Sequence, residues 1–248
     1  MPIIEACDIN FSYDNNVVLD HVSFSIEQGD YVGIVGPNGG GKTTLLKILS
    51  GLLEPLSGSI SIHGLPVKTF RDMGKIGYVP QRVSQSTGNF PATVYELVES
   101  GIAGKKNIFG KITQNDRQNI DKALSVAGIL ELKNRLMSQL SGGQKQRAFV
   151  ARALVSEPEI LILDEPFVGI DAKTQKEFYQ FLKMLNEEQN LTVIFVSHDV
   201  DIIAEEVKSI LCLNKGILCL DSPAQLHEPN VLENLYGKHI THIHHHAH

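Results

Sequence analysis

One glycine-rich segment constrains the fold of this 248-residue chain more than any other, namely Gly36-Pro37-Asn38-Gly39-Gly40-Gly41-Lys42-Thr43-Thr44. It matches the phosphate-binding pattern G-x-x-x-x-G-K-[ST] in full. The apolar run at 31–35 before it is typical of a buried strand, and the apolar-periodic stretch at 45–49 after it is typical of a helix. A strand, a tight loop and a helix in this order predict a site for an anion.

Each part of this segment has a chemical reason. The glycines let the backbone fold tightly, so that successive N–H groups point inward at the anion, and the positive end of the following helix adds to the same site. The Lys42 ammonium would reach the β- and γ-phosphates of a nucleotide, and the Thr43 hydroxyl would bind Mg²⁺. We therefore expect residues 36–44 to bind a nucleoside triphosphate together with magnesium.

Composition narrows the class of protein. Hydrophobic residues make up 42% of the chain, which is enough for a sizeable core. The net charge is −6 and no basic block occurs, so nucleic acid is not expected as a partner. No apolar run approaches about 18 residues and no secretory signal is visible, so we expect no membrane span. The three cysteines, Cys7, Cys212 and Cys219, form no C-x-x-C pair and are expected to be small buried residues in a reducing compartment.

The rest of the pattern alternates strands and helices. Apolar and alternating runs predict strands at 2–8, 17–26, 59–63, 76–79, 160–163, 192–196, 208–213 and 216–220. Helical spacing predicts helices at 93–99, 115–127, 141–155 and 173–188. The mostly helical region 83–139 interrupts the strands, so it is expected to form a subdomain. The turn Asn214-Lys215-Gly216 predicts that the last two strands form a hairpin.

Polar side chains follow several of these strands. Asp164 and Glu165 come directly after four apolar residues, where Asp164 fits a Mg²⁺ ligand and Glu165 fits a general base that polarises the attacking water. Gln81 follows the strand at 76–79, and His198 follows the strand at 192–196. Ligands bind at the carboxyl ends of parallel strands, so Gln81 is either a ligand contact or a solvated turn residue. His198 is either structural or a contact to the γ-phosphate.

Two further features suit a nucleotide. Tyr13 lies just before the strand at 17–26, where it either packs locally or stacks on a base. The run Leu140-Ser141-Gly142-Gly143-Gln144 opens a helix, with Ser141 as its N-cap and two glycines that leave backbone N–H groups uncovered. This predicts a second helix N-terminus suited to an anion.

The whole set resembles the ATP-binding subunit of an ATP-binding cassette (ABC) transporter. The match covers residues 3–225 and includes the Walker A loop at 36–44, the signature at 140–144 and the Walker B strand at 160–165. The resemblance implies an α/β fold, with a P-loop NTPase (RecA-like) core around a parallel sheet, an antiparallel β subdomain and a helical signature subdomain at about 83–155. Residues 1–237 would form one ABC ATPase domain, followed by a tail at 238–248.

The resemblance also implies roles for single residues. Tyr13 would stack on adenine, and Gln81 would be the Q-loop glutamine that helps to hold Mg²⁺ and water and links them to the membrane partner. Asp171 would be the D-loop acid, and His198 would be the switch histidine that senses the γ-phosphate. The chain would thus be an ATPase coupled to transport.

The family mechanism adds partners that spacing alone does not show. Two chains would sandwich two ATP molecules head to tail, so that the signature of one chain (Ser141, Gly142, Gly143 and Gln144) closes on the γ-phosphate held by Lys42 of the other. The isolated chain would then be a weak ATPase whose rate depends on protein concentration. The implied partners are an integral membrane permease, which docks a helix on the helical subdomain, and an extracytoplasmic metal-binding protein. The implied location is the cytoplasmic face of the cell membrane.

Two details resemble the branch that serves zinc and manganese importers. The stretch between Glu165 and Asp171 lacks the Thr-Ser-Ala run common in the wider family, and Gly40 stands where Ser is common. The leading hypothesis is therefore import of a divalent metal, with zinc first. Manganese, an iron siderophore, another small molecule and an exported lipid stay open as cargo. A metal-binding regulatory protein that uses ATP as a structural ligand is a third hypothesis, which the intact acid pair and His198 oppose.

The last ten residues contain six histidines, His239, His242, His244, His245, His246 and His248. Neutral imidazoles suit Zn²⁺, Ni²⁺ and Cu²⁺, and such a tract is typical of metal binding. An engineered purification tag is the alternative, although such tags are normally unbroken and this run is interrupted by Ile, Thr and Ala. Because the tract holds no acid or Cys, we expect a loose, exchangeable zinc site whose affinity falls below about pH 6.5.

Overall fold

The computed structural model describes residues 2–67, 73–81, 91–102, 112–166, 171–197, 200–221, 223 and 235–236. The chain divides into two compact units. The first unit comprises Met1–Glu27, Tyr31–Thr69 and Val196–His248, and the second comprises Gln28–Asp30 and Phe70–Phe195. The predicted loops at 84–89 and, for the most part, 101–111 lie outside the described residues.

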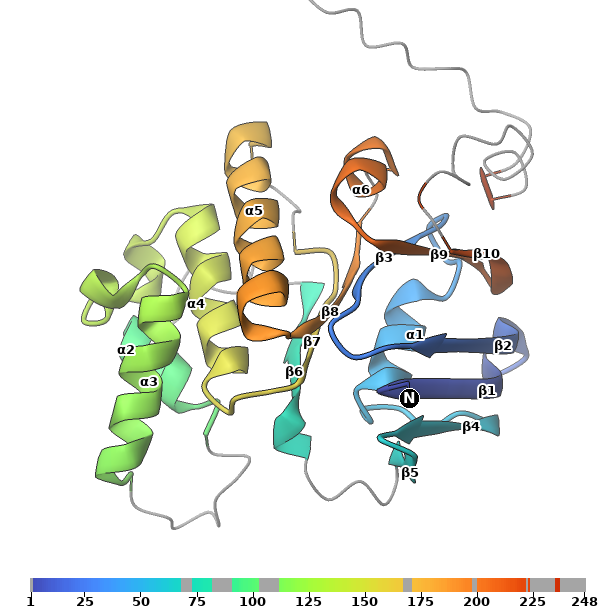
Figure 1. Cartoon of the computed structure of the whole chain (residues 1–248), viewed down its shortest axis with the longest axis horizontal. Coiled ribbons are helices and arrows are strands. Elements are labelled where there is room, and N and C mark those ends of the chain that lie inside the picture. The colour runs from blue at the N-terminus through green and yellow to red at the C-terminus, as the bar shows by residue number, and fades with distance from the viewer. Residues whose placement is uncertain are drawn as a thin grey trace, which may run out of the picture. The chain divides into compact units, whose positions relative to one another are not determined.

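An antiparallel sheet of four strands occupies the start of the first unit, in the order β2-β1-β4-β5 (Figure 1). Its strands are β1 (Ile4–Tyr13), β2 (Asn16–Ile26), β4 (Ser57–Ile62) and β5 (Leu65–Pro66). The predicted strands at 2–8 and 17–26 are present, and they extend further toward their shared turn than the sequence indicated. Side chains such as Ile4 and Ala6 are buried while the intervening Glu5 is exposed, as expected for a sheet covered on one face. This is the predicted antiparallel β subdomain.

The first unit also contains the strand that leads into the phosphate loop. This strand, β3 (Tyr31–Val35), pairs in parallel with β9 (Ser209–Asn214), which forms a hairpin with β10 (Gly216–Asp221). Helix α1 (Lys42–Leu49) follows the loop and contacts β2. The predicted hairpin turn is confirmed, since Lys215 adopts a positive φ of 64°. Helix α6 (Val200–Glu206) was not predicted from the sequence.

Three parallel strands lie in the second unit. The central strand β7 (Ile160–Leu163) pairs with β6 (Ile76–Val79) on one side and with β8 (Thr192–Val196) on the other. All four residues of β7 are buried, as the uninterrupted apolar run predicted. The parallel register brings the carboxyl ends of β6 and β7 to the same edge, because Val79 lies opposite Leu163. Gln81 and the Asp164–Glu165 pair therefore emerge from neighbouring strand ends.

The described part of the second unit contains the helices α2 (Val94–Glu99), α3 (Gln114–Val126), α4 (Gly142–Leu154) and α5 (Ala172–Gln189). Short 3₁₀ turns lie at Met73–Lys75, Leu130–Leu132 and Met137–Gln139. Helices α2, α3 and α4 contact one another, and α4 also contacts α5 (Figure 1). Each helix begins at a residue whose side chain accepts a backbone N–H, namely Thr93, Thr113, Ser141 and Asp171. Their bounds agree with the predicted helices to within a few residues. Among the described residues, no helix combines the length and apolar character needed to cross a membrane.

The cysteines differ in part from expectation. Cys212 and Cys219 are buried, as predicted, but they face each other across the β9–β10 hairpin and form a disulfide. Cys7 is exposed, so the prediction of a buried position is wrong for this residue. The reason is strand alternation, since Cys7 points to the opposite face of β1 from the buried Ala6.

Candidate active site

The phosphate loop at 36–44 lies in the first unit, between β3 and α1. Gly36 has a φ of +155°, and a Cβ at this position would lie 1.9 Å from the carbonyl oxygen of Leu213. Gly41 has a φ of +96°, and a Cβ there would lie 2.6 Å from the carbonyl oxygen of Val18. Glycine is therefore needed at both positions, because β9 approaches the start of the loop at Gly36 and β2 approaches its end at Gly41.

Lys42 is the cation of this loop. Its side chain is only 5% exposed, and its Nζ donates hydrogen bonds to the carbonyl oxygens of Gly36 (2.8 Å) and Pro37 (2.9 Å). A Cβ on Gly39 would meet no atom within 4 Å, so the crest of the loop is open. A buried ammonium, a helix N-terminus and an open glycine crest form a donor set that fits a phosphate group.

Tyr13 is the last residue of β1, rather than a loop residue that precedes the next strand. Its side chain is 47% exposed, and its ring packs edge-on against Phe11 with 4.9 Å between centroids. The hairpin that carries Tyr13 continues into β2, whose Val18 approaches Gly41 of the phosphate loop. The first unit thus brings an available aromatic face and the phosphate loop to the same hairpin.

The acid pair lies in the second unit at the end of β7. Asp164 is 2% exposed and Glu165 is 9% exposed. The side-chain amide of Gln81 donates a hydrogen bond to the Glu165 carboxylate, which brings two of the predicted residues into contact. Glu165 has a positive φ of 48°, a conformation that costs a side chain of this kind about 1–2 kcal/mol. Strain of this sort is typical of functional positions.

Tyr78 is a neighbour of the acid pair that the sequence analysis missed. Its hydroxyl donates a hydrogen bond to the Asp164 carboxylate. Burial raises the pKa of Tyr78 above its ordinary value, and the negative charge of Asp164 raises it further, so the phenol is neutral and acts as a donor. The contact depends on the register of β6 and β7, which a single sequence does not reveal. The available signal was a tyrosine three positions before Gln81, on the strand predicted at 76–79.

Buried carboxylates next to an amide are oxygen ligands of the kind that Mg²⁺ prefers, so the residues of the second unit fit this ion. Asp164 and Glu165 would supply the negative charge, and the Gln81 amide oxygen would remain as an acceptor while its nitrogen donates to Glu165.

The signature run begins α4 in the second unit. Ser141 caps the helix by accepting the N–H of Gln144 (3.3 Å), while the Gln144 side chain accepts the N–H of Ser141 (3.0 Å). A Cβ on Gly142 would lie in open space, whereas one on Gly143 would lie 2.5 Å from the methyl group of Thr174. The two glycines therefore have different structural roles. Gly142 is accessible to a ligand, and Gly143 permits α4 to pack against α5.

Asp171 caps α5 beside this signature. Its carboxylate accepts the backbone N–H (3.0 Å) and the hydroxyl (2.7 Å) of Thr174, the residue that also approaches Gly143. These hydrogen bonds, that of the side chain first, lower the pKa of Asp171 below its ordinary value. The predicted signature and the predicted D-loop acid are thus linked within the second unit.

Two predicted groups lie outside the described residues, namely His198 and the six histidines of the tail. Within the part of the chain that the structure describes, no cluster of three His, Cys, Asp or Glu side chains is arranged to hold a metal ion.

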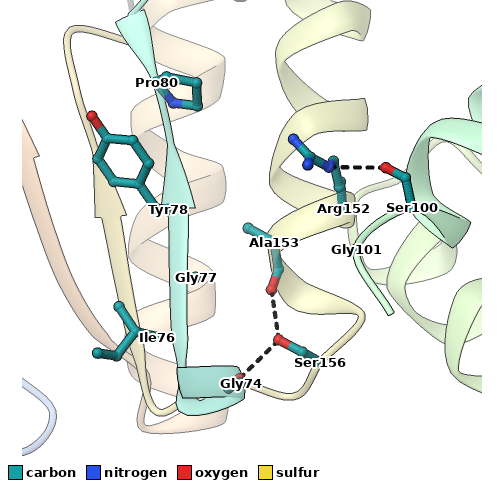
Figure 2. A pocket seen from close by; sticks show the side chains of 10 residues that line it. All are labelled: Gly74, Ile76, Gly77, Tyr78, Pro80, Ser100, Gly101, Arg152, Ala153 and Ser156. Atoms are coloured by element: carbon teal, nitrogen blue, oxygen red, sulfur yellow. Dashed lines mark hydrogen bonds between the residues drawn. The ribbon is translucent and has the colours of Figure 1, made fainter. Parts of the chain in front are cut away.

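A cavity of about 350 Å³ lies in the second unit between β6 and the ends of α2 and α4 (Figure 2). Arg152 of α4 donates to the hydroxyl of Ser100 (3.0 Å) on one side of it. The Ser156 hydroxyl donates to the carbonyl of Gly74 (2.8 Å) on another side. Tyr78 also belongs to its lining, so the strand that reaches the acid pair forms one wall of this cavity.

A family model described as ABC transporter matches residues 19–168, more than half of the chain. The chain belongs to the ABC transporter family. The zinc uptake system ATP-binding protein ZurA of Listeria innocua is 41% identical to this ABC protein, over 87% of the chain and 84% of ZurA. The high-affinity zinc uptake system ATP-binding protein ZnuC of Bacillus subtilis is 39% identical, over 87% of the chain and 93% of ZnuC.

Solved structures agree with this assignment. A bacterial ABC transporter cassette whose structure is dimeric is 30% identical, with a TM-score of 0.73 over 89% of this chain and 98% of the cassette. The same cassette is also known in a post-hydrolysis state bound to ADP and phosphate. The predicted fold class and the prediction of an ATPase coupled to transport are therefore confirmed. This ABC protein binds nucleotide and acts with a membrane permease.

Proposed function

We propose that this ABC ATPase powers the import of zinc through a membrane permease. The observation that carries the proposal is the similarity to zinc uptake ATP-binding proteins at 41% and 39% identity over 87% of the chain. The two branch details, at Gly40 and between Glu165 and Asp171, support the same cargo. A Cβ at position 40 would lie 2.9 Å from the Leu213 carbonyl, so a serine there requires a shift of the loop or hairpin. Manganese is the next cargo to test.

The phosphate loop would hold the nucleotide. The backbone N–H groups of residues 36–44 and the Lys42 ammonium would bind the phosphates, and the Thr43 hydroxyl would bind Mg²⁺. In exchange, Lys42 would leave the carbonyls of Gly36 and Pro37, to which it donates in this structure. The exposed ring of Tyr13 would stack on the adenine.

The acid pair would serve hydrolysis. Asp164 and the Gln81 oxygen would complete the ligands of Mg²⁺, whose charge neutralises the phosphates as they react. Glu165 would accept a proton from the attacking water, and the hydrogen bond from Gln81 holds its carboxylate in one orientation. His198 would contact the γ-phosphate.

The signature would act on a second copy of the chain. Ser141, the Gly142 and Gly143 amides and Gln144 would close on the ATP held by the other chain, and the open space at Gly142 supports a close approach there. Asp171, at the adjacent start of α5, would support this surface. The surface of the helical subdomain would receive a helix of the permease. Arg152 and Ser100, which line the cavity beside β6, would offer polar side chains to it (Figure 2).

The setting follows from this activity. We place the chain at the cytoplasmic face of the cell membrane, where ATP is available, with an extracytoplasmic protein that delivers the metal on the other side. The histidine tail would bind zinc loosely. A chain that ends at Gly237 should lose this zinc binding, which isothermal titration above about pH 6.5 would measure.

Transport in proteoliposomes tests the proposal. The chain and its permease would be reconstituted with ATP and Mg²⁺ inside the vesicle, and uptake of zinc would be compared with uptake of manganese and iron. We expect zinc uptake that requires ATP and that the variant Glu165→Gln abolishes. ATP-dependent uptake of manganese without zinc would replace the proposed cargo, and uptake without ATP hydrolysis would refute the coupling.

A further inference from the structure

The ends of strands β6 and β7 hold both acids of the candidate site in place. The backbone N–H of Asp164 donates to the Val79 carbonyl at 2.9 Å, so pairing of the two strands continues as far as the acid. Tyr78 lies opposite Ile162 in the register. Two further residues of strand span roughly 6.6 Å, which the length of a tyrosine side chain covers. The phenol therefore reaches the carboxylate of Asp164 from the adjacent strand.

Two side chains from the end of β6 serve two different acids. Gln81 donates to Glu165, and Tyr78 donates to Asp164. A hydrogen bond from a neutral hydroxyl to a carboxylate is charge-assisted and directional. Such a bond occupies one carboxylate oxygen and orients the other. This orientation matters for Asp164, because an acid that is 2% exposed has little water around it to form other hydrogen bonds.

We propose that Tyr78 is a positioning residue for Asp164 and fixes the carboxylate in the orientation that binds the Mg²⁺ of Mg-ATP. The inference rests on the proposed function, in which Asp164 is a ligand of this ion. Tyr78 acts through Asp164, the acid to which its hydroxyl donates. Its loss should therefore change the dependence on metal and leave metal-free nucleotide binding alone.

The variant Tyr78→Phe tests this directly, because it removes one oxygen and keeps the ring. Binding of a fluorescent ATP analogue to the full chain would be measured in EDTA and then as a function of Mg²⁺. Binding of Mn²⁺ to the chain with ATP, followed by electron paramagnetic resonance, gives a readout independent of hydrolysis. We expect the half-saturating metal concentration to rise about tenfold, with affinity in EDTA unchanged.

Tyr179→Phe is the matched control. Tyr179 is a buried tyrosine of the same unit that packs edge-on against Phe195, at 5.6 Å between centroids. This variant also removes a phenol oxygen from the interior, and it should leave the metal dependence as in the wild type. If Tyr78→Phe leaves the metal dependence unchanged, or weakens binding equally in EDTA, the inference is wrong.

A double-mutant cycle separates this inference from the proposed function. If Asp164→Asn does not alter the metal dependence, the proposed role of Asp164 fails. If Asp164→Asn weakens metal binding and Tyr78→Phe does not, only the role of Tyr78 fails. If Tyr78 acts through Asp164, adding Tyr78→Phe to Asp164→Asn should have little further effect. Independent, additive effects would overturn the inference.

Discussion

The phosphate loop of the first unit and the acid pair of the second offer different chemical groups to a ligand. The loop offers backbone N–H groups. At its glycines 36 and 41, neighbouring carbonyl oxygens leave no room for a side chain. The acid pair presents side chains that are buried and oriented by hydrogen bonds from Tyr78 and Gln81. The difference teaches that the loop should be sensitive to shape, whereas the acid pair should be sensitive to charge and to hydrogen-bond donors.

The largest effect is expected where charge alone is changed. Glu165→Gln keeps the shape of the side chain but removes the base, so ATP binding should persist while hydrolysis falls by about 10²- to 10⁴-fold. The variant should accumulate as an ATP-bound dimer, which gel filtration with ATP would detect. Hydrolysis at the wild-type rate would show that Glu165 is not the general base. It would also contradict the expectation that the acid pair is more sensitive to charge than the loop is.

The next effect is steric and lies in the loop. Gly36→Ala would place a Cβ 1.9 Å from the Leu213 carbonyl, so the loop or the hairpin must move. We expect ATP affinity to fall by about tenfold or more, since such strain costs 1–3 kcal/mol. Gly39→Ala is the control, because its φ is also positive, at +79°, but no atom lies within 4 Å. ATP titration would measure the affinity of both variants. Equal losses of affinity would show that the positive φ, rather than the close approach of the Leu213 carbonyl, makes glycine necessary.

The signature sharpens the comparison, because it contains a glycine of each kind. Gly143→Ala would place a Cβ 2.5 Å from the Thr174 methyl group, and we expect a loss of stability of about 1–2 kcal/mol by thermal unfolding. Gly142→Ala meets no neighbour and should leave stability unchanged. Thr174→Ser removes the methyl but keeps the hydroxyl that binds Asp171, so it should rescue Gly143→Ala. A failure of this rescue would contradict the packing argument.

The smallest effect is a dependence of stability on pH at Asp171. Its folded pKa lies below the unfolded value of about 4, so the charged cap stabilises the fold above that pH and the contribution is lost as pH falls through the folded pKa. The melting temperature of Asp171→Ala should thus lie below that of the wild type at pH 7, and the gap should close in acid. Asp171→Asn keeps a cap without a titrating charge and serves as the control. A gap that stays constant down to the acid limit would refute the assignment.

Local patterns were enough to predict most elements of the fold. Strands β6 and β7 have the predicted bounds. For β7 the reason is an uninterrupted apolar run, which is typical of a strand buried in a parallel sheet. The helix start at Ser141 was predicted from N-cap chemistry, and the structure shows that Thr93 and Asp171 cap their helices in the same way. Helix α6 was missed because its seven residues contain too few turns to show a period.

The candidate site was predictable only where adjacent residues define it. The phosphate loop is one run of adjacent residues, and the acid pair is another. The spacing of residues within each run is therefore enough to predict its chemistry. The contact of Tyr78 with Asp164, the disulfide between Cys212 and Cys219, and the packing of Gly143 on Thr174 depend on which strands and helices become neighbours. Those pairings come from tertiary packing, which spacing along one chain does not specify.

The short segment Gln28–Asp30 has a practical consequence. It belongs to the second unit although the residues on both sides belong to the first, and the buried Asn186 amide donates to the carbonyls of Gly29 (2.9 Å) and Asp30 (3.2 Å). The backbone passes between the units four times, after residues 27, 30, 69 and 195. No single cut therefore releases an intact unit. Expression of one unit by itself requires that its segments, three for the first unit and two for the second, be joined by new linkers.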